Sequence, residues 1–297
     1  LAFVLLLNAL FHLPFINEPP RSRHVWRQTF TLSVARNFYR EDMNILKPRV
    51  DNRGSTDGVT GMQFPLYEYG LACIYNVFGE HYWVNRLYAM LISSLGISFF
   101  FYWILTWTRN NIYAFSAAWM FTWAPEIFYH GFNALPDILS LSATAAALLF
   151  AFKFRKESRS LYIFLSMLFF LIAGLTKLQF LMSGVFWIFI LLSRETKVKE
   201  KMAIVFSGVA VVSLTISWYL HAVHMIQSSG LNEVGLEFRP LHDYTEAWKT
   251  ISHNIISDIP ELLSGYASFI FIITGLVFFF RFNKFKDANI YFLISWF

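Results

Sequence analysis

Residues 87–108 read LYAMLISSLGISFFFYWILTWT and contain no charged side chain. A helix of this length crosses the roughly 30 Å hydrocarbon core of a bilayer. Similar runs recur along the chain, which is 56% hydrophobic and only 14% charged, a composition too apolar for a soluble domain of this length. We therefore predict an all-α fold, a polytopic transmembrane helix bundle, with spans at residues 1–16, 84–108, 111–129, 135–153, 160–176, 178–193, 202–223, 263–280 and from 288 onward.

The short links between these spans carry basic residues in a regular pattern. KFRKESR (153–159), RETKVKEK (194–201), RFNKFK (281–286) and Arg109 alternate with the other links, so they fall on one side, which the positive-inside rule makes cytoplasmic. The opposite side receives the long loop 17–83, the turns at 125–137 and 176–179, and the loop 224–262. Exposed loops are polar in any protein, but the acids, histidines and tryptophans gathered here favour a site on this face.

We expect one domain over residues 1–297, continuing beyond both ends of the sequence, with the external loop 17–83 contributing to the active site. The net charge of +5 is spread over short loops, where it orients helices, so membrane lipids are expected partners and nucleic acid is not. The single Cys73 has no partner for an intramolecular disulfide, and we interpret it as a small packed side chain. The chain has no GxGxxG, P-loop, HExxH or GxSxG motif, so nucleotide, kinase, zinc-protease and serine-hydrolase functions have no support.

Within loop 17–83, helical spacing begins after the two prolines of NEPPRSR (17–23). A helix here would carry one apolar stripe, which suits a helix lying in the membrane interface with its first tryptophan toward lipid. A second face would carry an imidazole, a guanidinium, an amide and a hydroxyl, which either point to solvent or converge on a ligand. The stripe is Trp26, Phe30, Val34 and Phe38, and the polar face is His24, Arg27, Gln28 and Thr31.

Glycines at 54, 58 and 61 then predict an irregular loop, which either approaches a ligand closely or simply turns. Pro65 suits the first turn of the next helix. Glu68 follows it, either as a satisfied carboxylate at the helix start or as a binding residue. We assign Gln63 and Glu68 to substrate binding.

Four segments with this spacing resemble a known family: HVWRQ (24–28), VARNFY (34–39), PRVD (48–51) and FPLYEY (64–69). Together they are similar to the bacterial relatives of the dolichyl-phosphate-mannose protein mannosyltransferases. These are GT-C type membrane glycosyltransferases, a group that includes the aminoarabinose transferase of lipid A modification. The likeness is densest over residues 17–90 and continues more loosely through NALPDILSL (133–141) and GLTKLQF (174–180).

The resemblance implies a multi-pass enzyme of the bacterial plasma membrane, with its active site on the periplasmic or extracellular side. It would move a sugar from a polyprenyl-phosphate donor to a lipid, glycan or protein acceptor, inverting the anomeric centre. The acceptor hydroxyl needs a carboxylate and the departing phosphate needs cations. Asp51 and Asp137 match the carboxylate positions, and Arg27 and Lys177 are the expected phosphate partners, with His24 and Gln28 beside them in substrate binding.

The chain departs from the family pattern at two places. Relatives commonly carry an acid soon after the WRQ triplet, where this chain has Phe30, and another before Phe-Pro-Leu-Tyr, where it has Gln63. The catalytic base is therefore open between Asp51 and Asp137, and an inactive relative is an alternative. Asp137 could equally be a carboxylate that favours a helix N-terminus, and Lys177 a lysine reaching out from a helix end.

No cofactor is required by the sequence, and no motif supports a divalent metal. His221 and His224 are one helical turn apart, but no acid stands at ligand spacing beside them. Two other classes remain as alternatives. A transporter or flippase for a lipid-linked sugar or glycan would bury polar groups near the bilayer midplane, and a non-catalytic scaffold would not need paired acids and cations.

Overall fold

The computed structural model describes residues 1–231, 244–264, 269–270 and 273–274. Within them the regular secondary structure is helical, apart from one isolated bridge between Arg49 and Val59, which confirms the all-α class. The elements are α1 (Ala2–His12), η1 (Leu13–Phe15), α2 (Val25–Arg40), α3 (Leu66–Phe78), α4 (Tyr82–Thr108), α5 (Asn111–Trp123), α6 (Pro125–His130), α7 (Asp137–Glu157), α8 (Ser160–Thr176), η2 (Leu178–Gly184), α9 (Val185–Leu192), α10 (Val198–Ser229), α11 (Tyr244–His253) and the π-helix η3 (Asn254–Ser264).

Three of the described helices, α4, α7 and α10, are long and apolar enough to cross a membrane. Shorter apolar helices lie at 2–15, 160–176 and 178–192. These features indicate a membrane-associated helical protein. The expected spans at 263–280 and from 288 onward lie largely outside the described residues.

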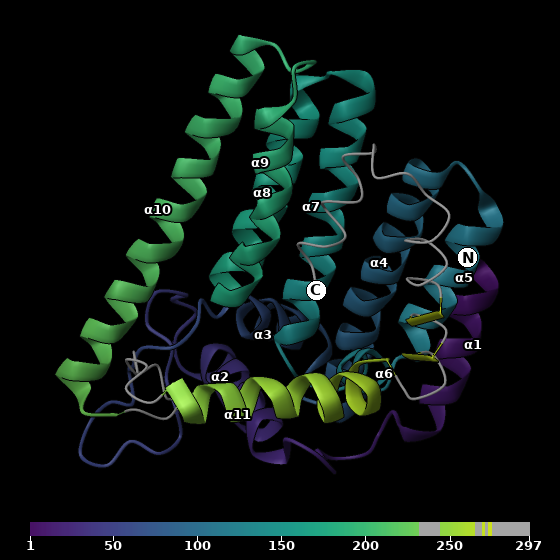
Figure 1. The fold of residues 1–297 in the computed structure, drawn as a ribbon. Helices are drawn as coiled ribbons and strands as arrows, with labels where there is room; N and C mark the ends of the chain where they lie inside the picture. Colours follow the sequence, from purple (N-terminus) through teal and green to yellow (C-terminus); the bar gives the residue numbers. More distant parts are fainter. Residues whose placement is uncertain (232–243, 265–268, 271–272, 275–297) are drawn as a thin grey trace.

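Helix α7 is the centre of the bundle, with α4 on one side and α8 on the other (Figure 1). Small residues allow the close approach, because Gly96 of α4 faces Ser142 and a Cβ added there would lie 2.2 Å from Ser142 Oγ. Side-chain hydroxyls tie the helices together: Ser142 Oγ donates to Ile92 O at 3.0 Å, and Ser166 Oγ of α8 donates to the α7 carbonyl of Ala147 at 2.7 Å. Packing through small residues and interhelical hydrogen bonds is typical of helices in membranes.

Several predicted helix boundaries are wrong for local reasons. The expected helix 111–129 breaks at Ala124, because Pro125 forces the residue before it into an extended conformation (ψ 128°) and starts α6. The segment 178–193 begins as 3₁₀ turns and becomes α-helical only at Val185. Helix α10 is longer than expected, since it covers 198–229 instead of 202–223.

One end of the bundle carries α2, α3 and α6, and α11 lies across it (Figure 1). The predicted helices inside loop 17–83 are confirmed as α2 and α3, which pack on each other. The apolar stripe of α2 is divided, however. Val34 and Phe38 are buried in a cluster with Val50 and Met62, whereas Trp26 is 62% exposed. Most of α2 is therefore held in the protein instead of lying free in an interface.

The loop before α3 is docked onto α10. Gly61 touches that helix so closely that an added Cβ would lie 1.8 Å from the carbonyl oxygen of Ala222. Trp218 Nε1 of α10 donates to Met62 O at 3.0 Å. The absence of a side chain at Gly61 thus allows the loop backbone to lie directly against the backbone of α10. Cys73, predicted to be packed, is exposed on α3.

Candidate functional site

A carboxylate held by two cations forms the centre of the candidate site. Arg27 Nη2 donates to Asp137 Oδ2 at 2.6 Å, and Lys177 Nζ lies 3.4 Å from Asp137 Oδ1. The side chains remain partly accessible, at 24% for Arg27, 23% for Asp137 and 15% for Lys177. The ion pairs therefore join residues 110 and 40 positions apart in the sequence at the end of the bundle that carries α2 and α3.

Helix ends position these three groups. Asp137 is the first residue of α7, after Pro136 at the N-cap, where the helix dipole favours a negative charge. Lys177 is the C-cap of α8 and has left the helical conformation (φ −151°, ψ 112°). Because its amine ends on Asp137, the alternative of a lysine reaching out to the bilayer surface does not fit. Arg27 lies in the first turn of α2.

Glu68 is buried behind this group. Its relative exposure is 0%, and neither carboxylate oxygen has a hydrogen-bond partner among the described residues. Burial raises the pKa of Glu68 to about 8. Its own backbone N–H and the charge of Lys177 act in the opposite direction and lower the pKa, and the charge of Asp137 raises it further. The side chain consequently keeps its proton at neutral pH. It is not the satisfied helix-start carboxylate considered from the sequence.

The side-chain NH₂ group of Gln28 is engaged in local structure. Its Nε2 donates to Tyr129 Oη at 2.8 Å and to the carbonyl oxygens of Arg21 and Arg23 at 3.1 and 3.3 Å. These bonds fasten the segment before α2 to α6. The predicted polar face of α2 is also incomplete, because His24 precedes the helix with a left-handed backbone (φ 57°).

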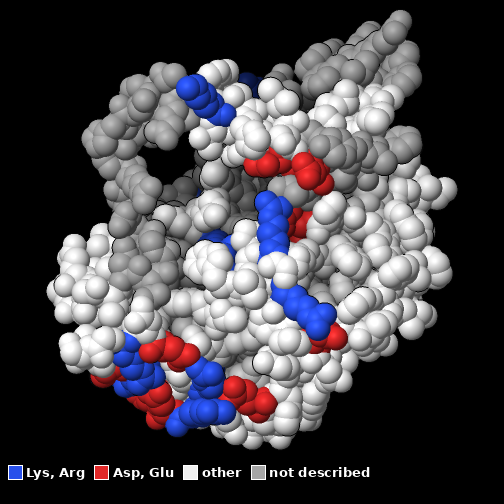
Figure 2. Space-filling model, turned by 90° about the horizontal axis from the view of Figure 1, so that it is seen from below, with Lys and Arg blue, Asp and Glu red and all other residues white. Residues whose placement is uncertain are grey.

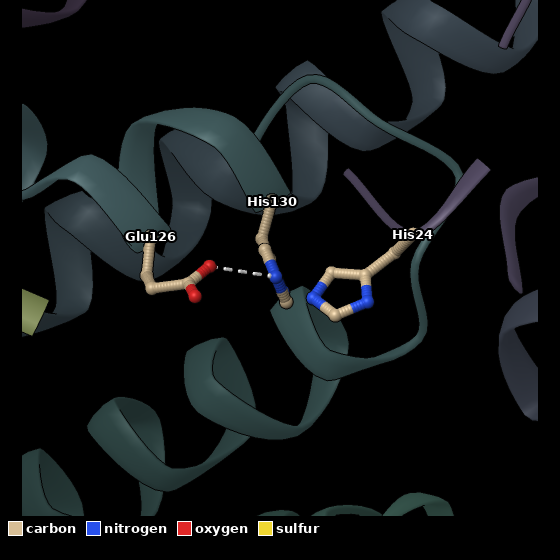
Figure 3. Close-up of side chains that lie close together, drawn as sticks. All are labelled: His24, Glu126 and His130. Atoms are coloured by element: carbon tan, nitrogen blue, oxygen red, sulfur yellow. Dashed lines mark ion pairs between the residues drawn. The ribbon is translucent and has the colours of Figure 1, made fainter. Parts of the chain in front are cut away.

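His24 instead meets two residues that sequence reasoning missed, Glu126 and His130 of α6. One potential ligand atom from each of the three residues lies within 4.8 Å of the others, and Figure 3 shows the His130 ring between Glu126 and His24. The spacing of Glu126 and His130, one helical turn apart directly after Pro125, was a signal available in the sequence. Their meeting with His24 was not, because it joins residues about one hundred positions apart.

Asp51 lies in a different set of contacts. It pairs with Arg36 and accepts a hydrogen bond from Asn37 Nδ2 at 3.0 Å, and its side chain is half exposed. Partial burial tends to raise the pKa of Asp51, but the bonds from Arg36 and Asn37 outweigh burial and hold it below its ordinary value. Asp51 and Asp137 share no ion-pair partner in the described part of the chain. Gln63 is half-buried in the loop before α3.

Other ion pairs lie at the same end of the bundle and account for many of its charged side chains. Arg49 pairs with Asp42 at 3.2 Å and Arg53 with Glu41 at 2.5 Å. Figure 2, which looks onto this end, shows basic and acidic side chains gathered on the face. Pairs of this exposed kind contribute little to stability individually.

Arg86, which sequence reasoning also missed, organises the region from inside. It is buried in the second turn of α4, and its guanidinium donates to the carbonyl oxygens of Glu18, Pro19 and Phe132, each at 3.1 Å. It thereby joins the segment before α2 to the turn between α6 and α7.

His221 and His224 are exposed on α10, and among the described residues neither belongs to a group of three potential metal ligands.

The chain was compared with models of known protein families, with curated proteins and with solved structures, and it matches none of them.

Proposed function

We propose that the protein is an integral membrane glycosyltransferase that moves a sugar from a polyprenyl-phosphate donor to a lipid, glycan or protein acceptor. The observation that supports this most directly is the contact of Arg27 and Lys177 with Asp137. Two cations and one ionised carboxylate leave a net positive charge, and neutral Glu68 does not cancel it. The group is therefore suited to a phosphate anion and retains a carboxylate beside it.

The proposed reaction follows from this charge arrangement. The donor phosphate binds Arg27 and Lys177, which releases part of their hold on Asp137. The freed carboxylate oxygen accepts the hydrogen bond of the acceptor hydroxyl and takes up its proton as the reaction proceeds. The acceptor oxygen forms a bond to the anomeric carbon while the bond from that carbon to the phosphate oxygen breaks. The lipid phosphate leaves with the bonding electrons, and the cations compensate its charge.

The family resemblance of HVWRQ, PRVD and FPLYEY is the second support for this proposal, and it includes a location on the outer face of the plasma membrane. It also keeps Asp51 as an alternative base. The geometry favours Asp137, because Asp137 lies with both proposed phosphate partners whereas Asp51 is engaged by Arg36 and Asn37.

The direct test uses the purified full-length protein in lipid nanodiscs with a panel of polyprenyl-phosphate sugars labelled in the sugar. Release of polyprenyl phosphate together with transfer of label to an added acceptor is the expected result. Movement of the intact sugar-lipid across liposomes, without release of lipid phosphate for any donor and acceptor, would contradict the proposal and favour a flippase.

Variants separate the proposed roles. Asp137→Asn should lower turnover by about 100-fold or more, the usual range for a lost general base, with little change in donor binding. Arg27→Gln and Lys177→Gln should each weaken donor binding by about 10-fold or more, since hydrogen bonds to charged groups contribute about 1.5–3 kcal/mol. Asp51→Asn is the comparison: a larger loss of turnover there than in Asp137→Asn would move the base to Asp51.

A further inference from the structure

We propose that His24, Glu126 and His130 form a binding site for a divalent first-row transition metal of the Zn²⁺ type. Two imidazole nitrogens and one carboxylate oxygen are a ligand set that zinc uses in catalytic sites, where a fourth position stays open to water or substrate. The three side chains come from two segments, the stretch before α2 and the short helix α6. The inference does not depend on the proposed glycosyl transfer.

The distances require only a small closure. Glu126 Oε2 lies 3.0 Å from His130 Nε2, and all three ligand atoms lie within 4.8 Å of one another. Zn–N and Zn–O bonds of about 2.0–2.2 Å place tetrahedral ligand atoms roughly 3.3 Å apart. The Glu126–His130 pair already meets this spacing. His24 must approach by at most about 1.5 Å, and it can do so because it precedes α2 instead of lying within a helix.

The surroundings of His130 also suit a ligand. Its Nε2 atom is buried, and its charged neighbour is Glu126 Oε2 at 3.0 Å. The Glu126 carboxylate and the His24 ring flank this nitrogen (Figure 3), as two further ligands of one ion would.

The electrostatic surroundings are compatible with a cation. Two cationic side chains, Arg27 and Arg23, lie near His24. Arg27 is paired with Asp137, which offsets part of its charge. Arg23 lies 3.5 Å from Glu126 Oε1, which is not the oxygen paired with His130, and its side chain is half exposed.

An ordinary ion pair between a protonated histidine and Glu126 would produce part of the same geometry. It would not require His24, whose ring lies edge-on to the His130 ring at 6.2 Å between centroids. Dependence of metal binding on all three residues therefore distinguishes a metal site from such a pair.

The test is a Co²⁺ titration of the metal-stripped, full-length, tag-free protein, followed by displacement with Zn²⁺. We expect one equivalent to bind with the visible absorption of a four- or five-coordinate Co²⁺ ion and to be displaced by Zn²⁺. His24→Ala, Glu126→Gln and His130→Ala should each weaken binding by about 10-fold or more, since even residues that only orient ligands contribute 10–100-fold. His81→Ala, which removes an exposed histidine before α4, should bind as the wild type does.

Absence of saturable Co²⁺ and Zn²⁺ binding, or unchanged affinity in the three variants, would overturn the proposal. Circular dichroism and size-exclusion chromatography establish that each variant is folded. His24→Ala keeps the test decisive if the α6 variants unfold, because His24 precedes α2 and its side chain belongs to none of the hydrophobic clusters of the described residues. The measurement records binding alone, so a failure of glycosyl transfer does not affect it.

Discussion

Replacing Glu68 by glutamine should make the protein more stable at neutral and alkaline pH. Glu68 is buried without a hydrogen-bond partner, and its pKa is about 8 in the folded protein against 4.5 for an ordinary glutamate. The folded state therefore binds a proton more tightly than the unfolded state does. Above pH 4.5 the unfolded chain releases this proton, and stability falls with rising pH until the folded carboxyl ionises near pH 8.

The structure sets the size of the effect. One pKa unit corresponds to 1.36 kcal/mol, so the Glu68 contribution lowers the free energy of unfolding by about 3 kcal/mol between pH 4.5 and pH 7, and by about 5 kcal/mol above pH 8. Glutamine has nearly the shape of the protonated acid and cannot ionise. Burial of an unpartnered polar group continues to cost free energy in the variant, and only the part that depends on pH is removed.

The assay is thermal unfolding of the detergent-solubilised protein between pH 5 and 9, for the wild type, Glu68→Gln and the exposed-residue control Glu195→Gln. We expect the midpoint of Glu68→Gln to rise above that of the wild type progressively from pH 5 to pH 8, and that of the control to follow the wild type. Parallel curves for Glu68→Gln and the wild type would show that Glu68 is ionised or hydrated at neutral pH, and would refute the reasoning.

Two further substitutions test the packing that supports the site. Gly61→Ala should lower the unfolding midpoint by the equivalent of at least about 2 kcal/mol, because the added Cβ would lie 1.8 Å from Ala222 O. The control Gly208→Ala should stabilise the protein slightly through helix propensity, because its added Cβ meets nothing within 4 Å. Equal effects of the two substitutions would contradict the docking of the loop on α10. Arg86→Met should lower the free energy of unfolding by at least about 3 kcal/mol in the same assay, because three carbonyl oxygens lose their hydrogen-bond donor. A change below about 1 kcal/mol would show that water replaces the guanidinium.

The sequence predicted helices well where a long apolar run marked them. It predicted helix boundaries less well where a proline or a 3₁₀ turn changes the backbone conformation. The run 87–108 is most of α4, the periodicity after Pro20 predicted α2, and Pro65 predicted the start of α3. The division of 111–129 into α5 and α6 was readable from Pro125. The 3₁₀ start of 178–184 was not, because its apolar composition is the same as that of an α-helix.

The sequence by itself determined that this is an all-α, membrane-associated protein, because uncharged helical runs need an apolar surrounding whatever their packing. It also pointed to Arg27, Asp137 and Lys177 through a family resemblance. Only the tertiary structure decided that these three meet, that Glu68 is buried beside them without a partner, and that His24 turns to Glu126 and His130. The physical reason is that each of these relations depends on how α2, α6, α7 and α8 pack, and contacts between residues 40 to 110 positions apart leave no periodic trace in the chain.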